Sequence, residues 1–152
     1  MQALGSFIRK TPRSTAATAF GISTATLIHF AWYADARMSG GVPALTLGAG
    51  VAHALAGALT GPRLLDGTRT RTSSQAALLG AGTSLLALAF FAPAFAIYLS
   101  ASNTQPSVLS YLAVTFFAGV FAFLAAGWAL LLLSVGVAWG LYRLTRTSRA
   151  SG

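Results

Sequence analysis

Apolar residues gather in four long stretches, which short polar or basic segments separate. A membrane-spanning helix needs about 20 mostly apolar residues, because the hydrocarbon core is about 30 Å thick and each residue rises about 1.5 Å. The four stretches approach or exceed this length, and we expect helices over about residues 14–34, 42–60, 74–100 and 108–142. The pattern therefore predicts an all-α, integral membrane four-helix bundle, running up-down-up-down, with residues 1–152 forming a single transmembrane domain.

Proline and glycine mark the ends of the second helix. Pro43 suits its first turn, where the missing N–H costs nothing. Gly61-Pro62 is expected to stop it and to open a polar loop over residues 61–73. The second stretch therefore predicts a short helix with a defined end.

The third and fourth helices carry different signals. Ser73 or Ser74 can cap the third helix by accepting bonds from the N–H groups of the first turn. Pro93 lies inside that helix and predicts a kink, because its ring clashes with the preceding turn. The fourth stretch, residues 108–142, would be roughly 52 Å long as one helix, so we expect it to tilt or to extend into the headgroup layer.

Charge is sparse and lies almost entirely on one side of the four-helix path. Only 8% of residues are charged, against about a quarter in a soluble domain. Nine basic residues fall on one side, and Arg37 falls on the other. The positive-inside rule therefore places both termini and the middle loop in the cytoplasm, with the chain in the cell (inner) membrane. The nine are Arg9, Lys10, Arg13, Arg63, Arg69, Arg71, Arg143, Arg146 and Arg149.

The net charge of +8 raises the question of a nucleic-acid partner. The basic residues lie between apolar stretches and do not alternate with aromatic ones, so we expect none. They are expected to face lipid headgroups instead. The candidates for headgroup contact are Arg69, Arg71, Arg143, Arg146 and Arg149.

The first apolar stretch has a second interpretation, as a cleaved signal peptide. Ala34-Asp35-Ala36 resembles a processing site after a basic start and an apolar run. The run is long for a signal peptide. We therefore expect a retained helix.

Small residues recur at helical spacing and mark the expected contacts between helices. In lipid, helices associate by close backbone approach at small residues and by a few polar contacts. On the second helix the stripe contains Gly50, Ala54, Gly57 and Gly61. A longer stripe on the fourth helix exceeds what one neighbour would use, so it points to another protomer or subunit. That stripe comprises Ala118, Ala122, Ala125, Ala129, Gly136 and Gly140.

His29 and His53 are the titratable residues well inside the apolar stretches, where an ionisable side chain is by default a functional hypothesis. Each shares a helix face with small or polar residues, so we expect both to point into the bundle. They could simply hydrogen-bond neighbouring helices. Alternatively, the pair could supply both axial ligands of a b-type haem, or form a proton path together with Asp35.

Few residues are suited to catalysis. The chain has no cysteine, no glutamate and two aspartates, and it contains no phosphate loop, nucleophile elbow or zinc helix. We therefore predict no enzymatic activity, no catalytic residue, no metal site and no cofactor apart from the haem alternative. The expected role is an auxiliary or scaffold subunit of a larger membrane complex or a homo-oligomer. The alternative is a small transporter or channel, whose path would need the hydroxyls of Thr18, Ser23, Thr26, Thr46, Thr83, Ser84, Thr115 and Ser134.

Overall fold

The protein is built from helices, and no strand occurs in the part of the chain that the structure describes. The all-α prediction is confirmed. The structure is a computed structural model that describes residues 7–8, 10–33, 42–66, 70–100 and 107–150. Its elements are α2 (Pro12–Tyr33), α3 (Val42–Leu65), α4 (Ser73–Ser100), α5 (Val108–Ala122), the π-helical segment η1 (Phe123–Gly127) and α6 (Trp128–Ala150).

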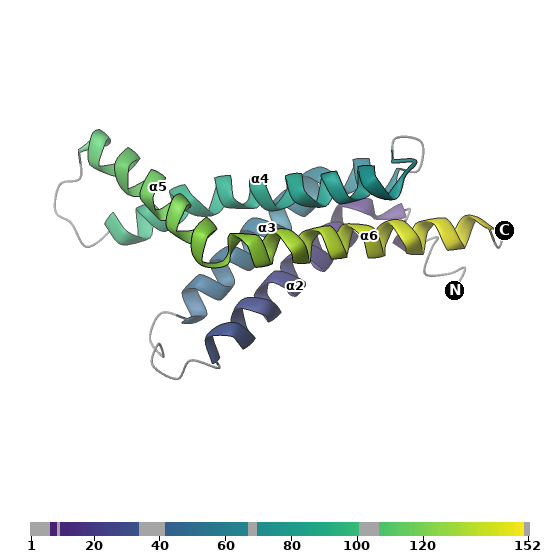
Figure 1. The fold of residues 1–152 in the computed structure, drawn as a ribbon, viewed down its shortest axis with the longest axis horizontal. Helices are drawn as coiled ribbons and strands as arrows, with labels where there is room; N and C mark the ends of the chain where they lie inside the picture. Colours follow the sequence, from purple (N-terminus) through teal and green to yellow (C-terminus); the bar gives the residue numbers. More distant parts are fainter. Residues whose placement is uncertain (1–6, 9, 34–41, 67–69, 101–106, 151–152) are drawn as a thin grey trace.

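The helices form two antiparallel pairs that converge at one end of the molecule. α2 packs mainly on α3, and α4 packs on α3, on α5 and on α6. Figure 1 shows the start of α2, the end of α3, the start of α4 and the end of α6 at the same end. Toward the other end, the α2–α3 pair diverges from α4 and α5 (Figure 1).

Two segments of the described chain are long and apolar enough to cross a membrane, namely Ser73–Ile97 in α4 and Trp128–Arg146 in α6. α2 and α3 are long enough, but glycines, hydroxyl residues and one histidine each dilute their apolar character. Four membrane crossings remain a prediction.

α3 continues to Leu65 with Pro62 inside it, so the expectation that Gly61-Pro62 ends the helix is wrong. Pro62 has no N–H to donate to the Ala58 carbonyl, so one backbone bond of the helix is lost. The carbonyl groups that follow in this last turn have partners. The backbone N–H of Asp66 donates to the Pro62 carbonyl at 3.1 Å. The Thr70 hydroxyl donates to the Arg63 carbonyl at 2.7 Å.

Thr72 caps α4, which corrects the expectation of Ser73 or Ser74. The backbone N–H of Gln75 donates to Thr72 Oγ1 at 3.2 Å. In return, Gln75 Oε1 accepts from the backbone N–H groups of Arg71 at 2.8 Å and Thr72 at 3.3 Å. This reciprocal arrangement is a capping box, which needs a hydroxyl residue three positions before the glutamine.

The fourth apolar stretch is not one regular helix. A π-helical turn over Phe123–Gly127 interrupts it, and α6 then runs on to Ala150. The Phe123 ring lies over Gly127, where a methyl group would come within 2.7 Å of ring atom Cδ2. α5 points away from the line of α6 at this turn (Figure 1). α4 runs through Pro93 to Ser100, and a kink there stays a prediction.

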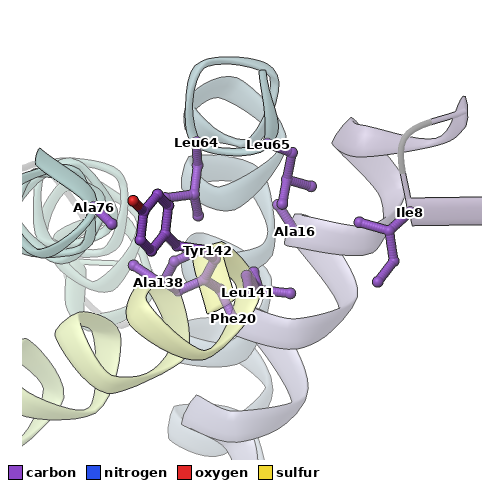
Figure 2. Packing of buried hydrophobic residues seen from close by; sticks show 9 residues of the cluster. All are labelled: Ile8, Ala16, Phe20, Leu64, Leu65, Ala76, Ala138, Leu141 and Tyr142. Carbon is purple, nitrogen blue, oxygen red and sulfur yellow. The ribbon is translucent and has the colours of Figure 1, made fainter. Parts of the chain in front are cut away.

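Large buried side chains concentrate where the helices converge (Figure 2). They come from α2, α3, α4 and α6 and from Ile8, which precedes α2. Away from this cluster, the hydrophobic residues buried in the described chain are all alanines: Ala49, Ala52, Ala56, Ala87, Ala92 and Ala96. The members of the cluster are Ile8, Ala16, Phe20, Leu64, Leu65, Ala76, Ala138, Leu141 and Tyr142.

Candidate functional site

His53 lies in the middle of α3 with only 4% of its surface exposed. Its Nδ1 is 3.1 Å from the carbonyl oxygen of Ala49, one turn earlier. Because a carbonyl only accepts, Nδ1 carries the proton, and in the neutral ring Nε2 presents a lone pair. Nε2 is buried without a hydrogen-bond partner among the described residues. The expected inward orientation therefore holds for His53, but its bond goes to its own helix.

His29 does not join His53. It is exposed on α2 and stands edge-on to Phe30, with ring centroids 6.1 Å apart. Gly21 of α2 lies against Gly50 and Ala54 of α3, which sets the register of the two helices. In that register the two histidines are separated by about eight residues, or about 12 Å along the helix axis. The two imidazoles are therefore not placed on either side of one haem, and Asp35 lies outside the described residues.

Buried hydroxyl groups connect α3 with α4. The hydroxyls of Thr60 and Thr83 are 2.8 Å apart. Thr60 Oγ1 also lies 3.0 Å from the Ala56 carbonyl, and Thr83 Oγ1 lies 2.7 Å from the Leu79 carbonyl. Because each hydroxyl has one proton, one threonine donates to the other, and the accepting threonine donates to the carbonyl of its own helix. This pair joins the two helix hairpins by a polar contact.

The other hydroxyl residues expected to line a path are scattered. Ser84 and Ser134 are buried, whereas Thr18 and Thr26 are exposed. Ser134 Oγ is buried without a hydrogen-bond partner among the described residues, and Thr46 Oγ1 shares this state. Ser23 and Thr115 are half-buried, and the Thr115 hydroxyl donates to the Tyr111 carbonyl at 2.9 Å.

The small stripe on α3 faces α2 at very short range. A methyl group on Gly57 would lie 2.9 Å from the carbonyl oxygen of Ala16, and one on Gly50 would lie 3.2 Å from Ala25 Cβ. Ala54 Cβ occupies the space next to Gly21. The backbones of α2 and α3 therefore approach each other at glycine and alanine along most of their shared length.

The stripe on α6 is arranged differently. α6 contacts α4 through Ser134 and Ala138, which lie against Gly80. A methyl group on Gly136 or Gly140 would meet no described residue within 4 Å. Within the described part of the chain these two glycines therefore form an uncovered G-x-x-x-G face. Ala129 is half-buried, and the side chains of Ala118, Ala122 and Ala125 lie outside the described part of the structure.

Comparison with protein-family models, curated proteins and solved structures finds no match. Two features escaped the sequence-based reasoning. One is Thr24, which is 1% exposed and lies one turn from the Gly21 contact. The other is the pairing of two arginines with aromatic rings on α6.

The basic residues of the described chain collect where the helices converge. Tyr142 links two of them, since its hydroxyl donates to the Arg71 carbonyl at 2.8 Å and accepts from Arg146 Nη1 at 3.0 Å. The Arg143 guanidinium lies 4.1 Å from the centre of the Trp139 ring. Arg69 lies outside the described residues, and so does the side chain of Arg149. The described basic residues at this end are Lys10, Arg13, Arg63, Arg71, Arg143 and Arg146.

Proposed function

We propose that this chain is a non-enzymatic multi-pass protein of the cell inner membrane that serves as an auxiliary or scaffold subunit in a larger assembly. The observation that carries the proposal is an inverted distribution of side-chain size. Among the residues that the structure describes, nine of the fifteen buried hydrophobic residues are alanine, while twenty-three large hydrophobic side chains are exposed. In water such a surface would drive aggregation. In lipid it is the expected arrangement, because small residues let backbones approach and large ones face the acyl chains.

The two candidate spans support the same proposal. The apolar window of each is only 28% buried, whereas a core helix of a soluble protein would be mostly covered. The span Trp128–Arg146 would be about 28 Å long, close to the hydrocarbon thickness. α2 and α3 run antiparallel beside these spans and turn Thr24 and His53 inward. We therefore propose four crossings, with the convergent basic end in the cytoplasm.

Single-cysteine labelling tests this topology directly, because the natural chain contains no cysteine. Ser14→Cys and Ser73→Cys place exposed thiols at the convergent end, and Val108→Cys places one at the start of α5. In intact cells we expect a membrane-impermeant maleimide to label position 108 and to spare positions 14 and 73. Permeabilised cells should show labelling at all three sites.

Two results would reject the topology. Labelling of position 73 on the opposite side from position 14 would exclude two crossings between them. Recovery of the unmodified chain from the soluble fraction, as a monodisperse species without detergent, would reject membrane insertion altogether.

The uncovered face of α6 supports the subunit role. Elsewhere, glycine pairs such as Gly57 and Gly61 are tightly covered by a neighbouring helix of the same chain. Gly136 and Gly140 show the same spacing, and no other described helix covers them within 4 Å. Because G-x-x-x-G is a contact face of membrane helices, we propose that another copy or a partner subunit packs here.

Bulky substitutions at this face test the assembly. Gly136→Ile with Gly140→Ile should reduce the mass of the complex in mild detergent to that of the single chain, because two side chains then fill the contact surface. Gly82→Ile is the matched control, since a methyl group at Gly82 also meets nothing within 4 Å. It should leave the mass unchanged. Native mass spectrometry separates a homo-oligomer from a complex with another subunit, and a wild-type chain that is monomeric would contradict the subunit role.

A transport role has less support. The Thr83 and Thr115 hydroxyls donate to carbonyls of their own helices, and Thr18 and Thr26 are exposed. The expected path residues therefore do not converge on one continuous line. The buried polar contacts instead join helices, as between Thr60 and Thr83.

A further inference from the structure

We infer that α6 binds the phosphate of an anionic glycerophospholipid between Arg143 and Arg146. The inference rests on the proposed membrane function. It names a ligand for one face of one helix, and it goes beyond the general attraction of a basic end for a negatively charged leaflet.

Both guanidinium groups are held over aromatic rings. Arg143 lies 4.1 Å from the centre of the Trp139 ring, and Arg146 lies 5.8 Å from the centre of the Tyr142 ring. Arg146 Nη1 also donates to the Tyr142 hydroxyl at 3.0 Å. Cation–π contact and this hydrogen bond restrict two otherwise flexible side chains. Restricting them in advance lowers the entropic cost of binding a ligand.

The two arginines share one side of α6. At about 100° per residue, Trp139, Arg143 and Arg146 lie within about 60° around the helix axis. Arg143 and Arg146 are about 4.5 Å apart along that axis. Guanidinium groups form bidentate, charge-assisted bonds with phosphate oxygens. Two arginines whose backbone positions are this close can bring their guanidinium groups to different oxygens of one phosphate.

The position along the helix selects a lipid as the source of the phosphate. Arg146 ends the candidate span that begins at Trp128, so both arginines would stand at the headgroup layer. Trp139, one turn below Arg143, is 41% exposed. Its ring can contact the glycerol and upper acyl region, where tryptophan is favoured in membrane proteins. A free phosphate would gain nothing from this apolar contact.

The surrounding charge favours an anionic over a zwitterionic headgroup. Lys10, Arg13 and Arg63 are exposed at the same end of the molecule, and Asp66 is the acidic residue described there. A choline or ethanolamine group would bring a further positive charge into this field. The ligand is therefore expected to be a phosphatidylglycerol or cardiolipin type of lipid.

Native mass spectrometry of the full chain with added phosphatidylglycerol or phosphatidylcholine tests the site. The double variant Arg143→Gln, Arg146→Gln is compared with Arg13→Gln, Arg63→Gln, which removes the same charge from the same end. Both double variants lose two positive charges and therefore part of the general attraction between this end of the protein and anionic lipid. We expect the first to lose at least about tenfold more affinity for phosphatidylglycerol, because charge-assisted hydrogen bonds are lost as well. Phosphatidylcholine binding should change equally in both.

Two further variants separate specific phosphate binding by Arg143 and Arg146 from the effect of their charge. Arg143→Lys with Arg146→Lys keeps the charge and removes the planar guanidinium groups. The affinity for phosphatidylglycerol should then fall to a value between those of the wild type and the glutamine variant. Trp139→Leu keeps both arginines and removes one supporting ring, and we expect about a threefold loss. Inorganic phosphate should not compete with the lipid.

Equal losses in the two glutamine doubles, or full affinity in the lysine variant, would overturn the inference. Competition by inorganic phosphate would also overturn it, since the ligand would then not be a lipid. The cysteine labelling described above is repeated on each variant. If the topology is correct and the two glutamine doubles lose equal affinity for phosphatidylglycerol, only the phosphate site at Arg143 and Arg146 is rejected. If the wild-type chain fails to insert into the membrane, the proposed function is rejected.

Discussion

Gly80→Ala is expected to destabilise the packing of α4 on α6 by about 3 kcal/mol. A methyl group on Gly80 would lie 2.5 Å from the Ser134 carbonyl oxygen, 2.8 Å from Ala138 Cβ and 2.9 Å from Val135 Cα. Two of these three atoms belong to backbone, so no side-chain rotation can relieve the overlap. The helices must move apart, and contacts along the whole seam then weaken.

Gly82→Ala provides the control within the same helix. Its methyl group would meet nothing within 4 Å, so only helix propensity changes, in favour of alanine. Thermal unfolding in detergent should show a large drop in midpoint for Gly80→Ala and no drop for Gly82→Ala. Equal midpoints for the two variants would show that α4 and α6 are not packed as the structure has them.

Helix existence was predictable from the sequence because the apolar stretches are long and their separators are short and polar. The shared location of the basic residues was predictable for a related reason. The chain reverses direction between successive apolar stretches. The basic residues before the first stretch, between the second and third, and after the fourth must therefore lie at the same end. Arg13 at the start of α2, Arg71 just before α4 and Arg143 near the end of α6 therefore belong to segments that lie at the convergent end (Figure 1).

Which helix packs on each small-residue stripe was not predictable, because the spacing identifies a helix face but not the element that covers it. The α3 stripe around Gly57 packs on α2, whereas Gly136 and Gly140 on α6 remain uncovered. α6 instead meets α4 at Ser134 and Ala138. The sequence did not predict Ser134 and Ala138 as a helix contact, because Ser134 stands between Leu133 and Val135 and forms no stripe of small residues.

His29 shows the same limit for polar residues. His29 and His53 each share a helix face with small or polar residues, yet His29 is exposed and His53 is buried. α2 meets α3 through Gly21, and the position of that contact decides which histidine faces the interior. The π-helical turn at Phe123–Gly127 was not predicted, because apolar periodicity does not distinguish one π-helical turn from a continuous α-helix.

Gly61→Ala is expected to have the second large effect, about 2 kcal/mol of lost stability. A methyl group there would lie 2.5 Å from Ala16 Cβ and 2.7 Å from the Pro12 carbonyl oxygen. In the sequence this glycine belongs to the small-residue stripe and also, with Pro62, to the expected helix stop. In the structure it is the point where α3 touches the start of α2. The two helices would have to separate at the convergent end, beside Leu64 and Leu65 (Figure 2).

The matched control is Gly140→Ala, in the last third of the chain, where a methyl group meets nothing within 4 Å. Unfolding of the dissociated single chain in detergent should leave this control at the wild-type midpoint and lower that of Gly61→Ala. If Gly61 merely ended the helix, alanine would extend α3 and raise its helicity without loss of stability. A lower midpoint together with unchanged helicity therefore identifies Gly61 as a contact residue, and a higher helicity at constant midpoint would identify it as a stop.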